Sequence, residues 1–311
     1  MRAAEAAASL GPMSETAISV TGLRKTYGDN HAVDGLDLEV RRGEVFALLG
    51  PNGAGKSTTV EILEGFRKRT AGDAQVLGFD PQHAGREFRE RIGVMLQTTS
   101  GRSFLSARES LHHAAALYPS PRDVDETLAA VGLEHKANAK PQLLSGGQRR
   151  RLDVALAVIG SPELVFLDEP TTGFDPEARR QFWGLIESLV DHGTTVVLTT
   201  HYLDEADHLA DRIGIIARGS LVALDTPAGL RARASHARVT WSEHGTAQSA
   251  NTDAPAALLR DLLARHDGEV PDLEVRRPSL EDVYLSLVGL DDGGTPSAPA
   301  ATGGSVKEAS R

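Results

Sequence analysis

The chain of 311 residues contains no cysteine. This absence excludes disulfide bonds, thiolate nucleophiles and zinc sites built on cysteine. No apolar run approaches the roughly 18 residues that a membrane-spanning helix requires, so we expect no transmembrane segment in the chain. The alanine-rich N-terminus is interrupted by Glu5 and soon followed by Gly11-Pro12, which is untypical of a signal peptide. We therefore expect a cytoplasmic location.

The chain also lacks an excess of basic residues. It has 33 Lys and Arg against 43 Asp and Glu, which gives a net charge of −10. Because nonspecific nucleic-acid binding depends on basic surfaces, we expect no nucleic-acid partner. With 40% hydrophobic and 24% charged residues, the composition is that of an ordinary globular protein. The length suggests about two domains of roughly 150 residues each.

Short apolar runs alternate with longer amphipathic stretches between residues 17 and 225. The runs are Val45–Leu49, Ile92–Leu96, Leu164–Leu167 and Thr195–Leu198. Continuous hydrophobicity is typical of strands covered on both faces, so this region predicts an α/β domain with a largely parallel sheet. Helical patterns dominate from about 100 to 160 and predict a helical insert. Its expected helices are Ala107–Leu117, Val124–Val131 and Gln148–Ile159.

The flanks of this domain have weaker patterns. Residues 1–16 are rich in small residues and are expected to form a flexible arm. Residues 226–290 predict a small C-terminal α+β accessory domain from a strand-like run and two helix-like runs: His236–Trp241, Ala254–Ala264 and Leu280–Leu287. Residues 291–311 contain no core-forming residues and are expected to be a disordered tail.

A glycine-rich segment follows the first apolar run directly. It reads Gly50-Pro51-Asn52-Gly53-Ala54-Gly55-Lys56-Ser57, with Thr58 next and a helix-like stretch to Leu63. Glycines let backbone N–H groups close around phosphate oxygens at the positive end of a helix. In this pattern, Lys56 reaches the β- and γ-phosphates of a nucleotide and Ser57 ligates magnesium. The strand and helix on either side favour a phosphate-binding loop over a chance glycine turn.

Two carboxylates, Asp168 and Glu169, end the apolar run at Leu164–Leu167. Ligands of open parallel sheets bind beyond the carboxyl ends of the strands, so we expect both residues beside the glycine-rich loop. Asp168 is then a candidate to hold the metal, through water. Glu169 is a candidate to take the proton from an attacking water. The alternative is a helix-capping pair at a strand end.

Two further polar residues follow apolar runs. His201 comes after Thr195–Leu198, and we expect its hydrogen bond to the γ-phosphate to hold the transition-state geometry. Gln97 comes after Ile92–Leu96 and is a candidate to touch magnesium and the attacking water. Taken alone, a histidine of this kind is more often structural, and a glutamine of this kind is an ordinary loop residue.

The segment Leu144-Ser145-Gly146-Gly147-Gln148 precedes an amphipathic helix. A serine and free backbone donors at a helix N-terminus make a second anion site. Lys56 and magnesium already bind the phosphates of a nucleotide in the same subunit, so that nucleotide does not require this second anion site. We infer that this segment closes over a nucleotide held by another copy, although Ser-Gly-Gly alone is commonly a linker.

Together these motifs resemble the ATPase subunits of ABC transporters over residues 17–225. The resemblance implies the P-loop NTPase fold with a helical insert, and ATP and Mg²⁺ as cofactors. It implies that Tyr27 stacks on adenine, the alternative being a strand core aromatic. It also implies that Ser145, Gly146 and Gly147 donate to the γ-phosphate held by the opposite subunit of a head-to-tail dimer, and that Gly173-Phe174-Asp175 couples the two sites. Phe174 departs from the leucine more usual in the family.

Two other stretches, Glu61–Phe66 and Pro278–Leu285, resemble the drug-resistance exporter ATPases of this family. This resemblance implies a separate membrane permease as partner, a second ATPase subunit (a homodimer is expected), and a peripheral position on the inner face of the cell membrane. The Pro278 stretch also fits an ordinary capped helix. Two alternatives stay open: a soluble ABC-type ATPase of translation or DNA repair, and a regulator that binds ATP without hydrolysis.

Overall fold

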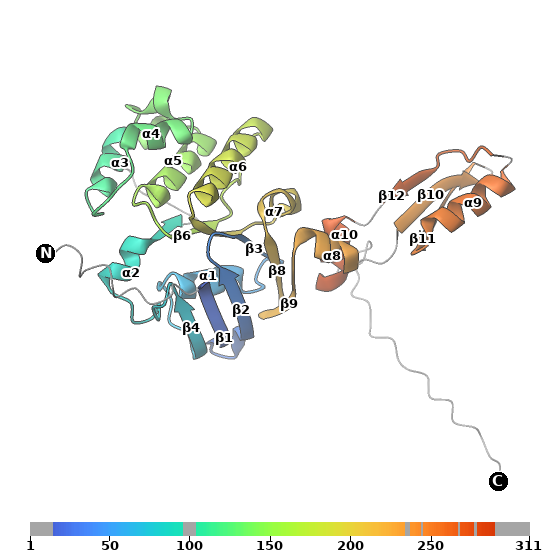
Figure 1. The fold of residues 1–311 in the computed structure, drawn as a ribbon, viewed down its shortest axis with the longest axis horizontal. Helices are drawn as coiled ribbons and strands as arrows, with labels where there is room; N and C mark the ends of the chain where they lie inside the picture. Colours follow the sequence, from blue (N-terminus) through green and yellow to red (C-terminus); the bar gives the residue numbers. More distant parts are fainter. Residues whose placement is uncertain are drawn as a thin grey trace, which may run out of the picture. The chain divides into compact units, whose positions relative to one another are not determined.

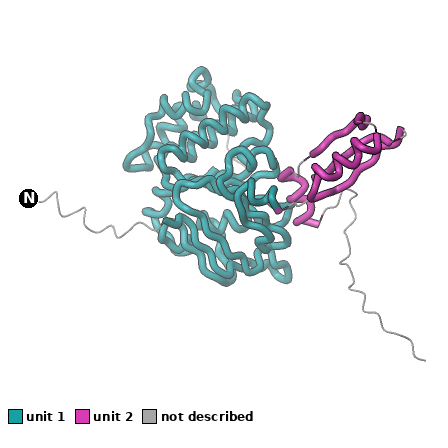
Figure 2. Tube along the Cα trace, turned by 45° about the vertical axis from the view of Figure 1, so that its right-hand side comes forward, with its two compact units in different colours: residues 1–232 teal, residues 233–311 magenta. Residues whose placement is uncertain are grey.

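The fold is taken from a computed structural model that describes residues 15–95, 104–233, 237–243, 245–266, 268–276 and 279–289. The chain divides into two compact units, Met1–Ala232 and Arg233–Arg311 (Figure 2). Among the described residues, no helix has both the length and the apolar character needed to cross a bilayer.

The first unit contains a six-stranded sheet in the order β5-β6-β7-β3-β8-β9. The strands are β3 (Val45–Leu49), β5 (Ile92–Met95), β6 (Leu164–Asp168), β7 (Thr195–Thr199), β8 (Arg212–Ala217) and β9 (Ser220–Asp225). All neighbours pair in parallel except β8 and β9. Every residue of β3 and β7 is buried, which confirms the prediction of strands covered on both faces. Leu96, the predicted end of the second run, lies outside the described residues.

A second, antiparallel sheet was not anticipated from the sequence. It has the order β2-β1-β4, formed by β1 (Thr16–Tyr27), β2 (Asn30–Arg41) and β4 (Ala71–Val76). Along β2 buried residues alternate with more exposed ones. The register of β1 shifts between Val20 and Leu23, where Gly22 adopts a φ of 58°. This irregularity breaks the alternation in β1 and hides the strand pattern in the sequence.

The other regular elements in the described part of the first unit are helices. They are α1 (Lys56–Leu63), α2 (Arg86–Arg91), α3 (Ala107–Ala115), α4 (Val124–Ala130), α5 (Gly146–Val158), α6 (Pro176–Asp191), α7 (Leu203–Leu209) and α8 (Pro227–Arg233), with 3₁₀ turns at Glu134–Lys136 and Pro141–Leu143. The three helices expected in the insert are confirmed as α3, α4 and α5. Figure 1 shows them grouped together, with β1, β2 and β4 on the far side of the main sheet.

The second unit is α+β, as the sequence predicted. Its strands β10 (Ala237–Glu243), β11 (Thr246–Thr252) and β12 (Glu274–Arg276) form an antiparallel sheet in the order β11-β10-β12. Its helices are α9 (Pro255–Arg265) and α10 (Leu280–Val288). Among its described residues, few apolar side chains are buried: Ala237, Val239, Leu262, Leu280 and Val283. His236 and Pro278, which belong to predicted features, lie outside the described residues.

Candidate active site

The glycine-rich loop joins β3 to α1 in a space that only glycine fits. A Cβ atom on Gly50 would lie 2.3 Å from the carbonyl oxygen of Ile216, and one on Gly55 would lie 2.3 Å from that of Ala32. Gly53 and Gly55 also adopt left-handed φ values of 79° and 104°. Side chains at these positions would clash or strain the backbone. The segment therefore forms the tight backbone cradle that phosphate binding requires.

Lys56 is held inside this cradle. Its Nζ donates to the carbonyl oxygens of Gly50 at 2.6 Å and Pro51 at 3.1 Å, and the residue is 7% exposed. Burial lowers the pKa of Lys56, and the nearby carboxylates of Glu169 and Asp168 oppose that shift. A desolvated cation attracts an anionic ligand more strongly than one in bulk water does. The ammonium is thus fixed beside the two carboxylates that the sequence predicted for this edge of the sheet.

The residues after Lys56 differ in exposure. Ser57 is exposed and Thr58 is half-buried, so the Ser57 hydroxyl is open to a ligand. Thr59 is buried, and its Oγ1 donates to the carbonyl oxygen of Gly55 at 2.9 Å. This hydrogen bond satisfies a carbonyl of the loop and helps to fix the start of α1.

Asp168 ends β6 and lies in register with Thr199 of β7. The Thr199 hydroxyl donates to Asp168 Oδ1. The backbone N–H of Glu169 donates to the carbonyl oxygen of Thr199 at 3.0 Å, and Arg150 of α5 donates to the carbonyl oxygens of both acidic residues. Glu169 itself adopts a left-handed φ of 46°, a conformation that costs roughly 1–3 kcal/mol and persists only where the surroundings impose it.

The side chain of Glu169 is contacted from two segments. Its Oε1 lies 3.4 Å from Nδ1 of His201, and its Oε2 accepts from the Thr172 hydroxyl at 3.4 Å. The rings of His201 and Tyr202 lie 4.1 Å apart. The structure therefore brings Glu169 and His201 together at the carboxyl ends of β6 and β7. Gln97, the third predicted catalytic residue, lies outside the described residues.

The donors available for a metal suit magnesium. No group of three or more His, Cys, Asp or Glu side chains able to hold a metal occurs in the described part of the chain. Magnesium, however, usually keeps several waters and takes one or two protein oxygens together with substrate phosphates. The Ser57 hydroxyl at the start of α1 and the Asp168 carboxylate at the end of β6 are such oxygens. These residues fit a nucleotide-bound magnesium ion and do not form a cage of their own.

Tyr27 lies at the end of β1 and is 40% exposed, which argues against the alternative of a strand core aromatic. The Lys25 ammonium lies 4.8 Å from the centre of its ring, and the Arg67 guanidinium lies 5.5 Å away. Arg67 also pairs with Glu61 at 2.5 Å. The exposed part of the ring is aromatic surface on which a nucleotide base can stack.

The Leu144–Gln148 segment starts α5 with a reciprocal cap. The N–H of Gln148 donates to Ser145 Oγ at 3.2 Å, and the N–H of Ser145 donates to Gln148 Oε1 at 3.0 Å. Ser145 and Gly146 are exposed. Within the described residues, no hydrogen bond or ion pair links this segment to the phosphate loop of the same chain. That separation is consistent with a role toward another copy.

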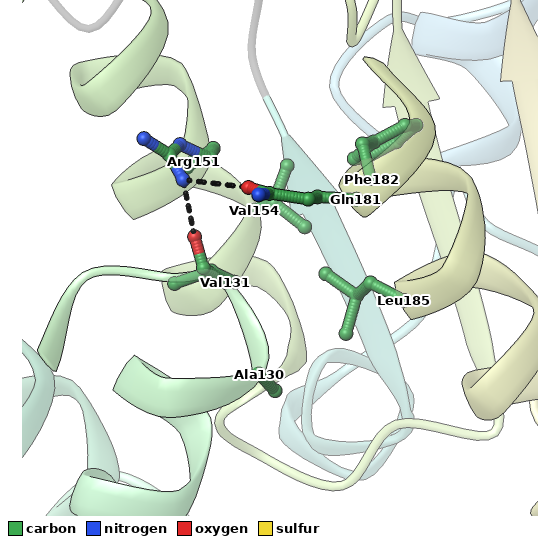
Figure 3. A pocket seen from close by; sticks show the side chains of 7 residues that line it. All are labelled: Ala130, Val131, Arg151, Val154, Gln181, Phe182 and Leu185. Atoms are coloured by element: carbon green, nitrogen blue, oxygen red, sulfur yellow. Dashed lines mark hydrogen bonds between the residues drawn. The ribbon is translucent and has the colours of Figure 1, made fainter. Parts of the chain in front are cut away.

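Arg151 ties α5 to its neighbours. Its Nη1 donates to the carbonyl oxygen of Val131 after α4 at 3.1 Å and lies 3.3 Å from Gln181 Oε1 of α6 (Figure 3). The ring of Phe174 packs edge-on against Phe182 of α6 with ring centres 6.0 Å apart, and Phe174 is 8% exposed. The larger side chain at this position is therefore accommodated in the core. Asp175 caps α6 by accepting from the N–H groups of its first turn.

Sequence reasoning missed Thr199, Arg150 and Arg67. Thr199 and Arg150 hold the segment that carries Asp168 and Glu169, and Arg67 lies against Tyr27. Thr199 ends a strand, as Asp168 does, and that position was a usable signal. Arg150 and Arg67 had no such signal in the sequence. Arg150 contacts the backbone carbonyls of Asp168 and Glu169, and Arg67 contacts the ring of Tyr27, and both sets of partners are distant in the sequence.

Comparisons with known proteins show the family of the chain. The family model described as ABC transporter matches residues 33–172. The chain is 40% identical to the daunorubicin resistance ATP-binding protein DrrA3 of Streptomyces coeruleorubidus over 310 residues, covering 90% of this chain and 98% of that protein. It is also 40% identical to the daunorubicin/doxorubicin resistance ATP-binding protein DrrA of Streptomyces peucetius, covering 91% of this chain and 96% of that one.

A solved structure shows the same fold. It is the dimeric post-hydrolysis state of an ATP-binding cassette bound to ADP and Pi, with a TM-score of 0.62 and 26% identity, and it covers 67% of this chain and 98% of that one. A phosphate loop, two carboxylates and a histidine meet at one sheet edge in a chain that matches these two daunorubicin-resistance proteins over nearly their full length. This protein belongs to the ABC transporter family as an ATP-binding subunit, homologous to drug-resistance exporter ATPases, and is an ATPase.

Proposed function

We propose that this chain is the ATP-hydrolysing subunit of an ABC exporter and drives the efflux of a drug or antibiotic through a separate membrane permease. The single observation that carries the proposal is the similarity to daunorubicin-resistance ATP-binding proteins over 98% of the length of one of them. The sequence matches both the nucleotide-binding unit and the appendage that follows it. A chain related only through the nucleotide site would not extend the likeness to the appendage.

The geometry of the site supports the catalytic roles proposed here. The backbone N–H groups of the loop from Gly50 to Ser57 and the Lys56 ammonium bind the β- and γ-phosphates, and the Tyr27 ring stacks on adenine. Ser57 and Asp168 would hold Mg²⁺, with Gln97 as a further ligand; when bound, this ion neutralises charge on the phosphates. These residues position and stabilise, because phosphoryl transfer requires little else of a protein.

Glu169 is the proposed base. Its carboxylate takes a proton from the attacking water, while His201, 3.4 Å from Oε1, orients that carboxylate and donates a hydrogen bond to the γ-phosphate. The left-handed backbone of Glu169 and its hydrogen bonds to Thr199 restrict where the carboxylate can lie. A base held in this way needs little reorganisation in the transition state.

A second copy completes the site in this proposal. Ser145, Gly146 and Gly147 lie at the start of α5, where Ser145 is the N-cap and the Gln148 side chain accepts from its N–H, and they would donate to the γ-phosphate bound by the partner. ATP then stabilises a closed homodimer. Hydrolysis and loss of phosphate remove those contacts and reopen it, a shift between two states driven by differential binding.

A hollow in the first unit supplies a docking surface for the permease. It has a volume of about 560 Å³, opens between the end of α1, α2 and α5, and is lined by Phe66, Arg89 and Tyr118 among others. Phe66 is 67% exposed, and Leu117, which lines an adjoining hollow, is 64% exposed. Exposed apolar side chains around a concavity mark protein contacts. The proposed location is the cytoplasmic face of the membrane.

The proposal is tested in the source organism with daunorubicin as the probe. The variant Phe66→Ser should raise the daunorubicin retained by cells to the level seen with the inactive Glu169→Gln variant. The basal ATPase rate of the purified Phe66→Ser protein should stay unchanged, because Phe66 touches the partner and not the nucleotide.

The matched control is Val222→Ser, which removes another exposed apolar side chain, on β9. It should retain no more daunorubicin than wild type. If Glu169→Gln cells also retain wild-type levels, this chain does not power daunorubicin export. If Glu169→Gln raises retention and Phe66→Ser does not, export is supported and the docking surface is wrong.

A further inference from the structure

A fully buried carboxylate in the first unit has no role in the function described so far. Glu205, in the first turn of α7, is 0% exposed, and neither of its carboxylate oxygens has a hydrogen-bond partner. Burial raises the pKa of Glu205. A buried carboxyl without direct hydrogen bonds lowers the stability of the folded protein. Its presence at this position therefore calls for an explanation in terms of function.

Two buried hydroxyls face this carboxyl, one from each loop of the active site. Thr171 and Thr200 are both 1% exposed, and both hydroxyls act to lower the pKa of Glu205. The Thr171 hydroxyl has no hydrogen-bond partner of its own. Thr200 Oγ1 accepts from the N–H of Tyr202 at 3.0 Å, which leaves its proton available to Glu205. Each hydroxyl therefore lies near the Glu205 carboxyl, whose oxygens form no hydrogen bond in this structure.

The two threonines belong to the two segments whose side chains contact the Glu169 carboxylate. Thr171 lies in the turn closed by the Thr172 N–H, which donates to the carbonyl oxygen of Glu169 at 3.3 Å. Thr200 directly precedes His201. Glu169 is contacted by Thr172 from the first segment and by His201 from the second. The spacing of these segments thus sets how Glu169 and His201 meet.

Helix α7 is itself held firmly against α6. Arg179 of α6 pairs with Asp204 at 2.9 Å, and its guanidinium lies 4.5 Å from the centre of the Tyr202 ring. Arg179 also acts to lower the pKa of Glu205, and Asp204 acts to raise it. Glu205 therefore projects from a fixed element toward two loops whose relative placement decides the geometry of catalysis.

We propose that Glu205 is a positioning residue that accepts hydrogen bonds from Thr171 and Thr200 when the site closes on ATP, and so fixes the distance between Glu169 and His201. This inference rests on the roles proposed above for those two residues. A small approach of either segment completes the hydrogen bonds. The gain is larger in a buried site than in water, because no solvent competes for the groups.

The test uses the purified full chain and compares steady-state phosphate release with ATP affinity. Glu205→Leu should lower kcat by roughly 10- to 100-fold, the loss expected when a catalytic group is misplaced by about 1 Å. The Kd for ATP should stay within about twofold of wild type, since the groups that act on Glu205 are Thr200, Thr171, Arg179 and Asp204 and not residues of the phosphate loop. Glu205→Gln keeps an acceptor oxygen and should restore most of kcat.

A second variant keeps the test decisive if Glu205→Leu fails to fold. Thr171→Val removes one hydroxyl with little change in shape and should lower kcat about three- to tenfold, the rate equivalent of one hydrogen bond. Where Glu205→Leu does fold, adding Thr171→Val to it should cause no further loss, because both remove the same contact. The matched control is Asp207→Asn on the same helix, whose carboxylate pairs with Arg231 and should not affect kcat.

Three results would overturn the inference: wild-type kcat in Thr171→Val, equal losses in kcat and ATP affinity, or no rescue by Glu205→Gln. The Glu169→Gln variant is measured alongside. If it turns over at the wild-type rate, the role proposed for Glu169 is wrong and the inference falls with it. If it is inactive while the Glu205 and Thr171 variants behave as wild type, only the positioning role of Glu205 is wrong.

Discussion

The pKa values of single residues in this site are set by the balance between burial and nearby charge. Lys56 is 7% exposed, and its pKa is lowered by desolvation against the pull of Glu169 and Asp168. Glu64, also 7% exposed, has its pKa raised to about 8, chiefly by burial and further by Asp168 and Glu61. A bound triphosphate would favour the charged form of Lys56. A bound cation would reduce the repulsion between Asp168 and the neighbouring carboxylates.

The first prediction at this scale concerns Glu169, the proposed base. Glu169→Gln should reduce kcat by about 10²- to 10⁴-fold while ATP still binds, because the amide fills the same space and cannot accept the proton. Phosphate release and calorimetric ATP titration measure the two effects separately. Glu177→Gln, an exposed change in the first turn of α6, is the control. Turnover near the wild-type rate would remove Glu169 from this role.

The second prediction concerns Glu64 and the dependence of stability on pH. Its folded pKa of about 8 lies above the ordinary 4.5, so between these values the folded state holds a proton that the unfolded chain has released. Stability should therefore fall as pH rises through this window. Glu64→Gln removes that dependence and should stabilise the protein at pH 8.5, by up to a few kcal/mol at about 1.4 kcal/mol per pKa unit.

Urea unfolding at a series of pH values, without nucleotide and in EDTA, measures this effect. The exposed Glu87→Gln on α2 is the control and should follow wild type. Equal stability of wild type and Glu64→Gln at pH 8.5 would show that Glu64 is not held protonated by its surroundings.

Elements meet at the site through very close backbone approaches. The phosphate loop lies against β2 at Gly55 and Ala32, and the N–H of Gly219 donates to the carbonyl oxygen of Ala54 at 3.0 Å. Gly219 in turn accepts from the N–H of Asp34 at 2.8 Å. The loop is therefore supported on one side by the antiparallel sheet and by the turn between β8 and β9. Its shape depends on the packing of both sheets.

Gly55→Ala tests this support. The added Cβ would meet the Ala32 oxygen at 2.3 Å at a φ of 104°, so the loop must shift. We expect ATP affinity to fall more than about tenfold and the unfolding free energy to fall by roughly 1–3 kcal/mol. Gly184→Ala in α6, where a Cβ meets nothing within 4 Å, is the control and should leave both unchanged or raise stability slightly. Wild-type ATP affinity in Gly55→Ala would contradict the proposed cradle.

At the scale of the whole molecule, charge opposes dimerisation. Each chain has a net charge of −10, so two copies repel at low salt. In the proposed dimer, contacts through ATP must exceed this repulsion. Association should therefore depend on nucleotide and become stronger as added salt screens the charges.

The dimer prediction uses the variant that binds ATP without turning it over. Glu169→Gln with ATP and magnesium should sediment as a dimer, and adding Ser145→Arg should keep it a monomer, because the start of α5 would no longer fit the partner's phosphate. Asp123→Arg, which replaces the exposed N-cap of α4, should leave the dimer intact. A Glu169→Gln protein that stays monomeric at moderate salt would count against closure by nucleotide alone.

Much of the fold was open to prediction because its signals are local. The apolar runs at Val45–Leu49, Leu164–Leu167 and Thr195–Leu198 became β3, β6 and β7, since a strand covered on both faces needs no polar positions. The helices of the insert followed from their helical sequence pattern. The antiparallel sheet did not, because bulges in β1 break its alternation and its pairing joins segments far apart in the sequence.

The sequence by itself determined the chemistry available to this protein: the glycine cradle with Lys56, the carboxylates Asp168 and Glu169, and His201. These can be identified because backbone geometry and charge demand those residue types at short, fixed spacings. Only the tertiary structure decided how they meet. The 3.4 Å approach of His201 to Glu169, the support from Thr199 and Arg150, and the burial of Glu205 depend on contacts between distant segments. Such contacts leave no periodic trace in the chain.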